Sequence, residues 1–217
     1  LTKASVETIT KQGSYGAAAG YYLIKDKDNS VSGNDVYTTY IVEVVGNVTI
    51  KSKSNVPSFE KKIKDTNDTT GVTSDWQDSA DYDIGDQVPF KLEGTVADNY
   101  ADYKTYYFAF HDVEESGLTF KSDSVKVYVD GSEIKSGYEV VTATTDGCTF
   151  EVVFNNLKEI TAVKAGSKVT VEYTSELNAN AVLGKEGNVN KAQLEFSNNP
   201  NKEQTGKPDT GKTPWDN

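Results

Sequence analysis

The segment Val125-Lys126-Val127-Tyr128-Val129-Asp130-Gly131 alternates apolar and polar side chains and ends in an Asp-Gly pair. Alternation with a period of two is typical of a half-buried β-strand, and Asp-Gly is typical of a tight turn. The pattern recurs where residues 150–154 end at Asn155-Asn156 and where residues 169–173 follow Ala165-Gly166. Short strands between turn-forming residues predict an all-β protein, built as an immunoglobulin-like β-sandwich.

Helices contribute little to this expectation. The best candidates are two short stretches, residues 157–160 and 176–182, and we expect neither to organise the fold. A further strand is predicted nearer the N-terminus, in Tyr40-Ile41-Val42-Glu43-Val44-Val45, where β-branched residues dominate.

Turn-forming residues divide the chain into three zones. Residues 1–55 hold few strands, too few for an independent core, so we expect them to be the C-terminal part of a preceding β-rich domain. Pro57 marks a boundary, and residues 56–200 are predicted to form one complete sandwich. Residues 201–217 are polar and rich in Gly and Pro, which predicts a linker toward a further domain. The chain starts at Leu1 and contains no Met, so we expect a fragment of a longer protein.

The composition disfavours several classes of function. All 22 basic residues are Lys against 33 acidic residues, a net charge of −11, so we expect no nucleic-acid partner. The one cysteine, Cys148, cannot form an internal disulfide and lacks the spacing of a zinc site; we expect it to be half-buried in a strand. No apolar run is long enough for a membrane span in this fragment. The sequence predicts no cofactor and no metal site.

Two polar side chains fall in phase with apolar neighbours. Lys61 alternates with Phe59 and Ile63, and Asn198 alternates with Phe196. Side chains two residues apart lie on one face of a strand, so both polar groups are predicted to point into the sandwich. Inward lysines are rare, although an off-phase lysine is also explained by a side chain at a strand edge that reaches solvent.

A third polar side chain, Asp112, alternates with Phe108 and Phe110 in a middle strand. Taken alone, an Asp at the end of a strand usually forms a turn. His111, the only histidine, falls in the opposite phase, so we expect it to be exposed or half-exposed. A Ser-His-Asp triad would need this histidine, and no nucleophile motif supports one.

An inward lysine, acid and asparagine together fit one reaction. Burial lowers the pKa of a lysine and raises that of an aspartic acid, so the pair can rest as a neutral amine and a neutral acid. The amine can then attack the asparagine side-chain carbonyl and release ammonia. The product is an isopeptide cross-link between two side chains, formed once per molecule.

Five segments carry a resemblance to a known family. They are Val56-Pro57-Ser58-Phe59-Glu60-Lys61-Lys62, Tyr82-Asp83-Ile84-Gly85-Asp86-Gln87-Val88-Pro89-Phe90, Phe110-His111-Asp112, Glu176-Leu177-Asn178 with Gly187-Asn188-Val189-Asn190, and Leu194-Glu195-Phe196-Ser197-Asn198-Asn199-Pro200. In this order they resemble the isopeptide-forming domain of Gram-positive fimbrial shaft proteins, the major pilins, whose sandwich is of the collagen-adhesin-like class. The resemblance covers residues 56–200.

The resemblance implies an intramolecular Lys–Asn isopeptide bond between Lys61 and Asn198, with Asp112 as the assisting acid. Lys62 and Asn199 are the alternatives for the two linked residues. It also implies a structural subunit of a cell-surface pilus, not an enzyme, in an extracellular fimbria attached to the cell wall. Its partners would be neighbouring pilin subunits joined by sortase.

Two other functions remain open from the sequence. An adhesin module could bind a host matrix protein or a glycan through an aromatic surface, with Tyr103, Tyr106 and Tyr107 as candidates, although cross-strand packing explains them equally well. A glycan-active enzyme would need a pair of carboxylates, but most acidic residues lie in polar turns, which we expect to be solvated. Lys207-Pro208-Asp209-Thr210-Gly211 echoes a cell-wall sorting signal and is interpreted as linker.

Overall fold

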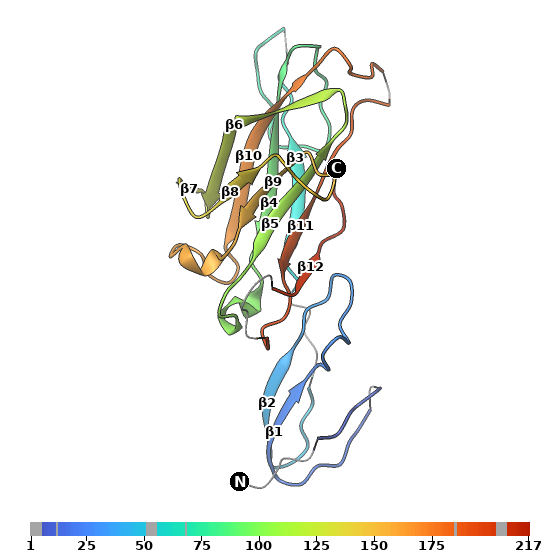
Figure 1. The fold of residues 1–217 in the computed structure, drawn as a ribbon, viewed down its shortest axis with the longest axis vertical. Coiled ribbons are helices and arrows are strands. Elements are labelled where there is room, and N and C mark those ends of the chain that lie inside the picture. The colour runs from blue at the N-terminus through green and yellow to red at the C-terminus, as the bar shows by residue number, and fades with distance from the viewer. Residues whose placement is uncertain (1–5, 12, 51–55, 68, 185, 203–207) are drawn as a thin grey trace.

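A computed structural model describes residues 6–217 except 12, 51–55, 68, 185 and 203–207. The described residues contain two antiparallel sheets of five strands each, with a separate hairpin at the N-terminal end (Figure 1). Within these residues, no helix is long and apolar enough to cross a membrane. The predicted all-β sandwich is confirmed.

The two sheets are each built from strands that are distant in sequence. The first has, in spatial order, β3 (Ser58–Ile63), β4 (Gln87–Thr95), β10 (Lys168–Leu177), β6 (Leu118–Val129) and β7 (Ser132–Ile134). The second has β12 (Thr210–Lys212), β11 (Asn190–Ser197), β5 (Phe108–Glu114), β9 (Phe150–Phe154) and β8 (Glu139–Val141). Two 3₁₀-helices, η1 (Asp98–Asp102) and η2 (Leu157–Glu159), lie in the connections.

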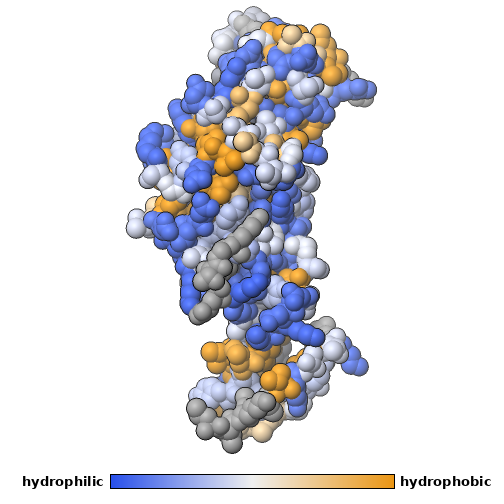
Figure 2. All heavy atoms as spheres, viewed as in Figure 1, coloured by the Kyte–Doolittle hydropathy of each residue, from blue (hydrophilic) through white to orange (hydrophobic). Residues whose placement is uncertain are grey.

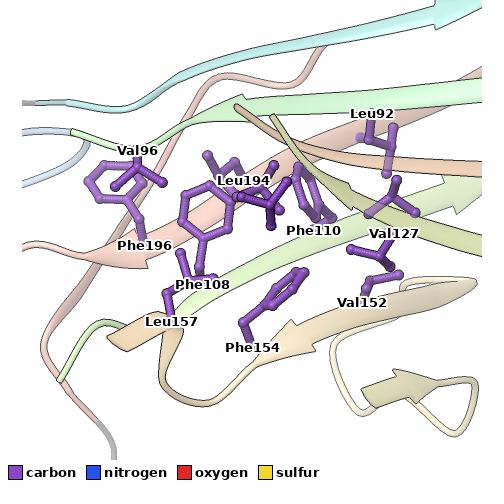
Figure 3. Packing of buried hydrophobic residues seen from close by; sticks show 14 of the residues in the cluster. Leu92, Val96, Phe108, Phe110, Val127, Val152, Phe154, Leu157, Leu194 and Phe196 are labelled. Atoms are coloured by element: carbon purple, nitrogen blue, oxygen red, sulfur yellow. The ribbon is translucent and has the colours of Figure 1, made fainter. Parts of the chain in front are cut away.

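The core lies between the sheets and is dominated by aromatic side chains. Figure 3 shows Phe108, Phe110 and Phe154 of the second sheet facing Leu92 and Val127 of the first. Strand β10 shows how the sequence dictates this packing, because its side chains alternate strictly between buried and partly exposed positions along all ten residues. Burial of one face of each sheet fixes the register, since a slip of one residue would expose the apolar set.

The N-terminal hairpin is less well covered than the sandwich. Strands β1 (Gly20–Lys25) and β2 (Thr39–Val44) pair with each other only, and they extend away from the two sheets in Figure 1. The side chains of Leu23 and Ile41, which are paired across the hairpin, are 64% and 78% exposed, and apolar patches are visible on this part of the surface (Figure 2). Neither strand of this hairpin contains a buried residue, so the hairpin has little core of its own.

Three segments differ from the sequence-based expectation. Residues 176–177 continue strand β10, so no helix begins at Glu176; Leu177 points into the core. Residues 157–160 hold only the single turn η2. Part of the segment predicted as linker is strand β12, which pairs with β11 and completes the second sheet. The domain boundary predicted at residue 200 therefore does not mark the end of the sandwich.

Candidate cross-linking site

A polar cluster is enclosed between the two sheets, and we call it the Lys61 cluster. Strands β3 and β10 of one sheet and β5 and β11 of the other supply its four members. They are Lys61, Tyr173, Asp112 and Asn190, with exposed fractions of 4%, 2%, 0% and 6%. Each alternates with buried or partly buried apolar residues on its strand, and this alternation turns the polar side chain inward.

The lysine amine touches all three partners. Its Nζ atom lies 2.6 Å from Oδ2 of Asp112 and donates to Oδ1 of Asn190 at 2.5 Å. It also donates to the hydroxyl of Tyr173 at 3.0 Å. The amine is therefore in contact with both an acid and a carboxamide carbonyl, the two groups that isopeptide formation requires.

Tyr173 joins the other members to one another. Its hydroxyl donates to Oδ2 of Asp112 at 2.7 Å and accepts from Nδ2 of Asn190 at 2.9 Å. With the contact to Lys61, the hydroxyl bonds to every member of the cluster. It thus fixes the carboxamide plane and the acid relative to the amine.

Burial shifts the titration of the lysine and the acid in opposite directions. It lowers the pKa of Lys61, although the neighbouring Asp112 opposes this shift. It raises the pKa of Asp112, again against the attraction of the lysine. Both shifts favour the neutral amine and the neutral acid. Oδ1 of Asp112 is buried without a hydrogen-bond partner among the described residues, which costs less for a neutral acid than for a carboxylate.

The walls of the site are aromatic and exclude water. The rings of Phe90 and Tyr173 stack at 5.4 Å, and the amine of Lys61 lies 5.1 Å from the centre of the Phe90 ring. Phe150 packs edge-on against Tyr173 at 4.9 Å. Such a surrounding keeps the local dielectric low, and this strengthens both pKa shifts.

A second acid, Glu114, borders the cluster. It lies two residues beyond Asp112 on the same face of β5. Burial raises the pKa of its carboxyl to about 7. The hydroxyl of Ser175 donates to Oε1, and Nδ2 of Asn190 lies 3.5 Å from the same atom. Glu114 therefore helps to orient the same amide nitrogen of Asn190 that Tyr173 binds.

The structure brings Lys61 and Asp112 together as predicted but places Asn198 elsewhere. Its side-chain amide donates to the backbone oxygen of Asp35 at 3.3 Å, at the end of the sandwich near the N-terminal hairpin. Asn198 is eight residues beyond Asn190, which corresponds to about 25 Å along an extended strand. Asn198 lies away from the cluster because β5 and β11 pair in antiparallel orientation. Asn190, at the start of β11, therefore lies opposite Glu114, at the end of β5.

The alternatives to these residues also lie outside the cluster. Lys62 points away from the core and pairs with Asp78 at 2.6 Å. Asn199 is buried, but its amide donates to Asp209 at 3.0 Å. Of the residues predicted for the cross-link, Lys61 and Asp112 thus lie in one cluster, and the asparagine beside them is Asn190.

Two other expectations are corrected. His111 is only 3% exposed, because β5 lies in the middle of its sheet and residues around Cys148 cover its outer face. Tyr103 and Tyr106 are buried in the aromatic core, and their rings pack edge to face at 4.8 Å. They form no exposed aromatic surface of the kind that an adhesin would need. Cys148 is partly buried, as predicted.

Sequence reasoning missed Asn190 and Tyr173. Asn190 shares the inward phase of Ala192 and Leu194, so the alternation already contained it, but Asn198 satisfies the same rule. Tyr173 alternates with Val171 and has the phase of an ordinary core aromatic. Only its hydroxyl contacts reveal a role in the site.

Comparisons with known proteins agree with this architecture. No family model matches the chain. The trypsin-resistant surface T6 protein of Streptococcus pyogenes serotype M6 is 28% identical over an alignment of 173 residues, and the match covers 74% of this chain and 30% of that protein. The chain thus spans less than a third of this relative.

Solved structures extend the similarity to the fold. The full-length major pilin SpaD of Corynebacterium diphtheriae matches 92% of this chain and 46% of its own, with a TM-score of 0.56 and 20% identity. The fold is that of the major pilins. The T6 backbone pilin of S. pyogenes matches 83% of this chain and 41% of its own, with a TM-score of 0.52 and 23% identity. The resemblance to major pilins predicted from the sequence is thereby confirmed.

Proposed function

We propose that the chain is a structural subunit of a Gram-positive surface pilus, hardened by an autocatalytic isopeptide bond between Lys61 and Asn190. The observation that carries the proposal is the contact of a buried amine with a carboxamide oxygen at 2.5 Å and a buried acid at 2.6 Å. The similarity to T6 and to the fold of SpaD supports the pilus role. In this role the protein is not an enzyme with an external substrate, and its partners are further pilin subunits joined by sortase at the cell wall.

The reaction needs no group from outside the cluster. The neutral amine of Lys61 adds to Cγ of Asn190, and the new C–N bond replaces the bond to the amide nitrogen. Asp112, as the neutral acid, gives its proton to the departing nitrogen and takes one from the attacking nitrogen, so the acid ends unchanged and the departing nitrogen leaves as ammonia. The preformed contacts supply the effective concentration that this slow exchange requires.

The intact mass of the purified chain under denaturing conditions tests the proposal. The expected mass is lower than the sequence mass by one ammonia, and a digest should contain a branched peptide that joins Lys61 to Asn190. The Asn190→Ala and Asp112→Ala variants should have their full sequence mass. Asn198→Ala is the matched control and should keep the deficit.

Either of two results would contradict the proposal. One is a wild-type chain at its full sequence mass. The other is a deficit that survives Asn190→Ala, which would assign the cross-link to a different carboxamide.

A further inference from the structure

A second cluster of chemically reactive side chains lies on the opposite side of strand β5. Its centre is His111, which points away from the Lys61 cluster because adjacent residues of a strand face opposite sides. Glu151 is its register partner on β9, and the turn before β9 adds Asp146 and Cys148. We call these residues the His111 cluster: His111, Asp146, Cys148 and Glu151.

The four side chains converge on a small volume. One candidate ligand atom from each lies within 4.8 Å of every other. Nδ1 of His111 is 3.2 Å from Oδ2 of Asp146, 3.2 Å from Oε1 of Glu151 and 3.8 Å from Sγ of Cys148. Tetrahedral zinc, with bonds of about 2.1 Å to N or O and 2.3 Å to S, needs edges of roughly 3.4 and 3.6 Å. The cluster already has these dimensions around its histidine.

The other nitrogen of the ring is held in the manner typical of metal-binding histidines. Nε2 of His111 is 2.9 Å from Oε2 of Glu195, a carboxylate that is almost fully buried. An imidazole that donates from Nε2 to a carboxylate presents the lone pair of Nδ1, and such pairs orient histidine ligands in metal sites. Lys212 lies 3.6 Å from the same glutamate oxygen and balances part of its charge.

The charges of the cluster also favour a bound cation. With Nε2–H engaged by Glu195, the lone pair of Nδ1 would face two carboxylate oxygens at 3.2 Å. A neutral imidazole has a single N–H, so this contact is repulsive unless a second proton or a metal ion lies between. Nitrogen, sulfur and oxygen ligands together select a borderline-soft divalent ion over calcium or magnesium.

We propose that the His111 cluster binds one divalent transition-metal ion of the zinc class. Binding converts the Cys148 thiol to a thiolate and releases its proton to solvent. Asp146, whose side chain is 36% exposed, provides the entry from solvent. The bound ion would tie the turn before β9 to the outer face of β5. The inner face of the same strand carries Asp112.

Titration of the reduced, chelator-treated full chain with Co²⁺ tests the proposal. Cobalt bound to a thiolate gives a charge-transfer absorption band, so one equivalent should produce this band and Zn²⁺ should displace it. The band should be lost in Cys148→Ala and in His111→Gln. Glu195→Gln should keep the band and weaken zinc binding by about 10–100-fold, as expected for a residue that positions the histidine.

The matched control is Asp123→Asn, which removes one acidic group from the opposite sheet and should leave the titration unchanged. Absence of the band in the wild type, or zinc binding that survives Cys148→Ala, would overturn the proposal. Because Cys148→Ala does not touch the Lys61 cluster, its intact mass should still show the loss of ammonia. The two proposals can therefore fail separately.

Discussion

The double variant Lys61→Met with Asp112→Leu tests whether the buried pair is covalently linked. Methionine and leucine match the shapes of the lysine stem and of the aspartate, so the variant leaves neither a cavity nor an unpaired charge. Asn190 and Tyr173 keep their mutual hydrogen bond of 2.9 Å, but the Tyr173 hydroxyl loses its acceptor Asp112 and Oδ1 of Asn190 loses its donor Lys61. The variant cannot form the isopeptide bond.

The size of the effect follows from the loop that the bond closes. Residues 61 and 190 are 129 positions apart. By the chain-entropy relation for cross-links, such a loop stabilises the folded state by about 5 kcal/mol. For a sandwich of this size, unfolding entropy converts this loss to a decrease of roughly 15 °C in Tm.

An uncrosslinked pair predicts the opposite sign. Replacing a buried ion pair by apolar groups of similar volume is neutral or stabilises a protein by about 1–4 kcal/mol. The assay is calorimetric melting of wild type and variant, with the mass of each sample checked first. A double variant that melts at or above the wild-type temperature would refute the cross-link.

The chain offers a matched control on the neighbouring residue. Lys62 and Asp78 form a pair with the same 2.6 Å separation as Lys61 and Asp112, but the Asp78 side chain is 80% exposed. Exposed pairs contribute about 0–1 kcal/mol, so Lys62→Met with Asp78→Asn should change Tm little. The contrast between the two double variants isolates the buried site from the general effect of removing one pair of charges.

Three further outcomes are expected. Tyr173→Phe removes the hydroxyl that positions Asp112, and it should slow cross-linking by roughly tenfold, measured as the unlinked fraction by mass against time after refolding. Burial raises the pKa of Glu114 from 4.5 to about 7, so the native state holds this proton more tightly; the resulting stability is complete below pH 4.5 and falls by about 3 kcal/mol as pH rises to 7. Glu114→Gln should flatten that part of the curve of Tm against pH. Gly94→Ala would place a Cβ 2.8 Å from Cζ of Phe108 and should cost about 1–3 kcal/mol in chemical unfolding.

Several strands could be predicted from the sequence because their side chains alternate between buried and more exposed positions, as in β4 and β10. Residues 150–154 were predicted as a strand and form β9 with the same bounds. The failure at residues 176–182 has a definite cause: Glu176 and Leu177 are good helix formers, but Leu177 completes the inward row of β10. Tertiary packing outweighs local propensity here.

The sequence predicted which side chains of the candidate site point inward. It did not predict the register that decides which of them meet. Alternation turned Lys61 and Asp112 inward, and both predictions of burial are confirmed. Alternation alone does not say which end of β11 meets the end of β5, and Asn190 and Asn198 have the same phase. The antiparallel arrangement of those two strands decides between them, and this arrangement depends on contacts far apart in sequence. The same limit hides the His111 cluster, whose members meet only after β9 pairs with β5.

A cross-link at Asn190 in place of Asn198 would change where tension passes through the chain when it is pulled from both ends. In the cross-linked form, force that enters β3 crosses to the start of β11 and leaves through that strand, so residues 62–189 are bypassed. Strand β11 itself then lies in the path of the force. It cannot lengthen by much, because a strand rises about 3.3 Å per residue and a fully extended chain reaches only about 3.6 Å. A link at the start of the last long strand therefore limits extension almost as well as one at its end, and it places the bond among buried side chains between the two sheets.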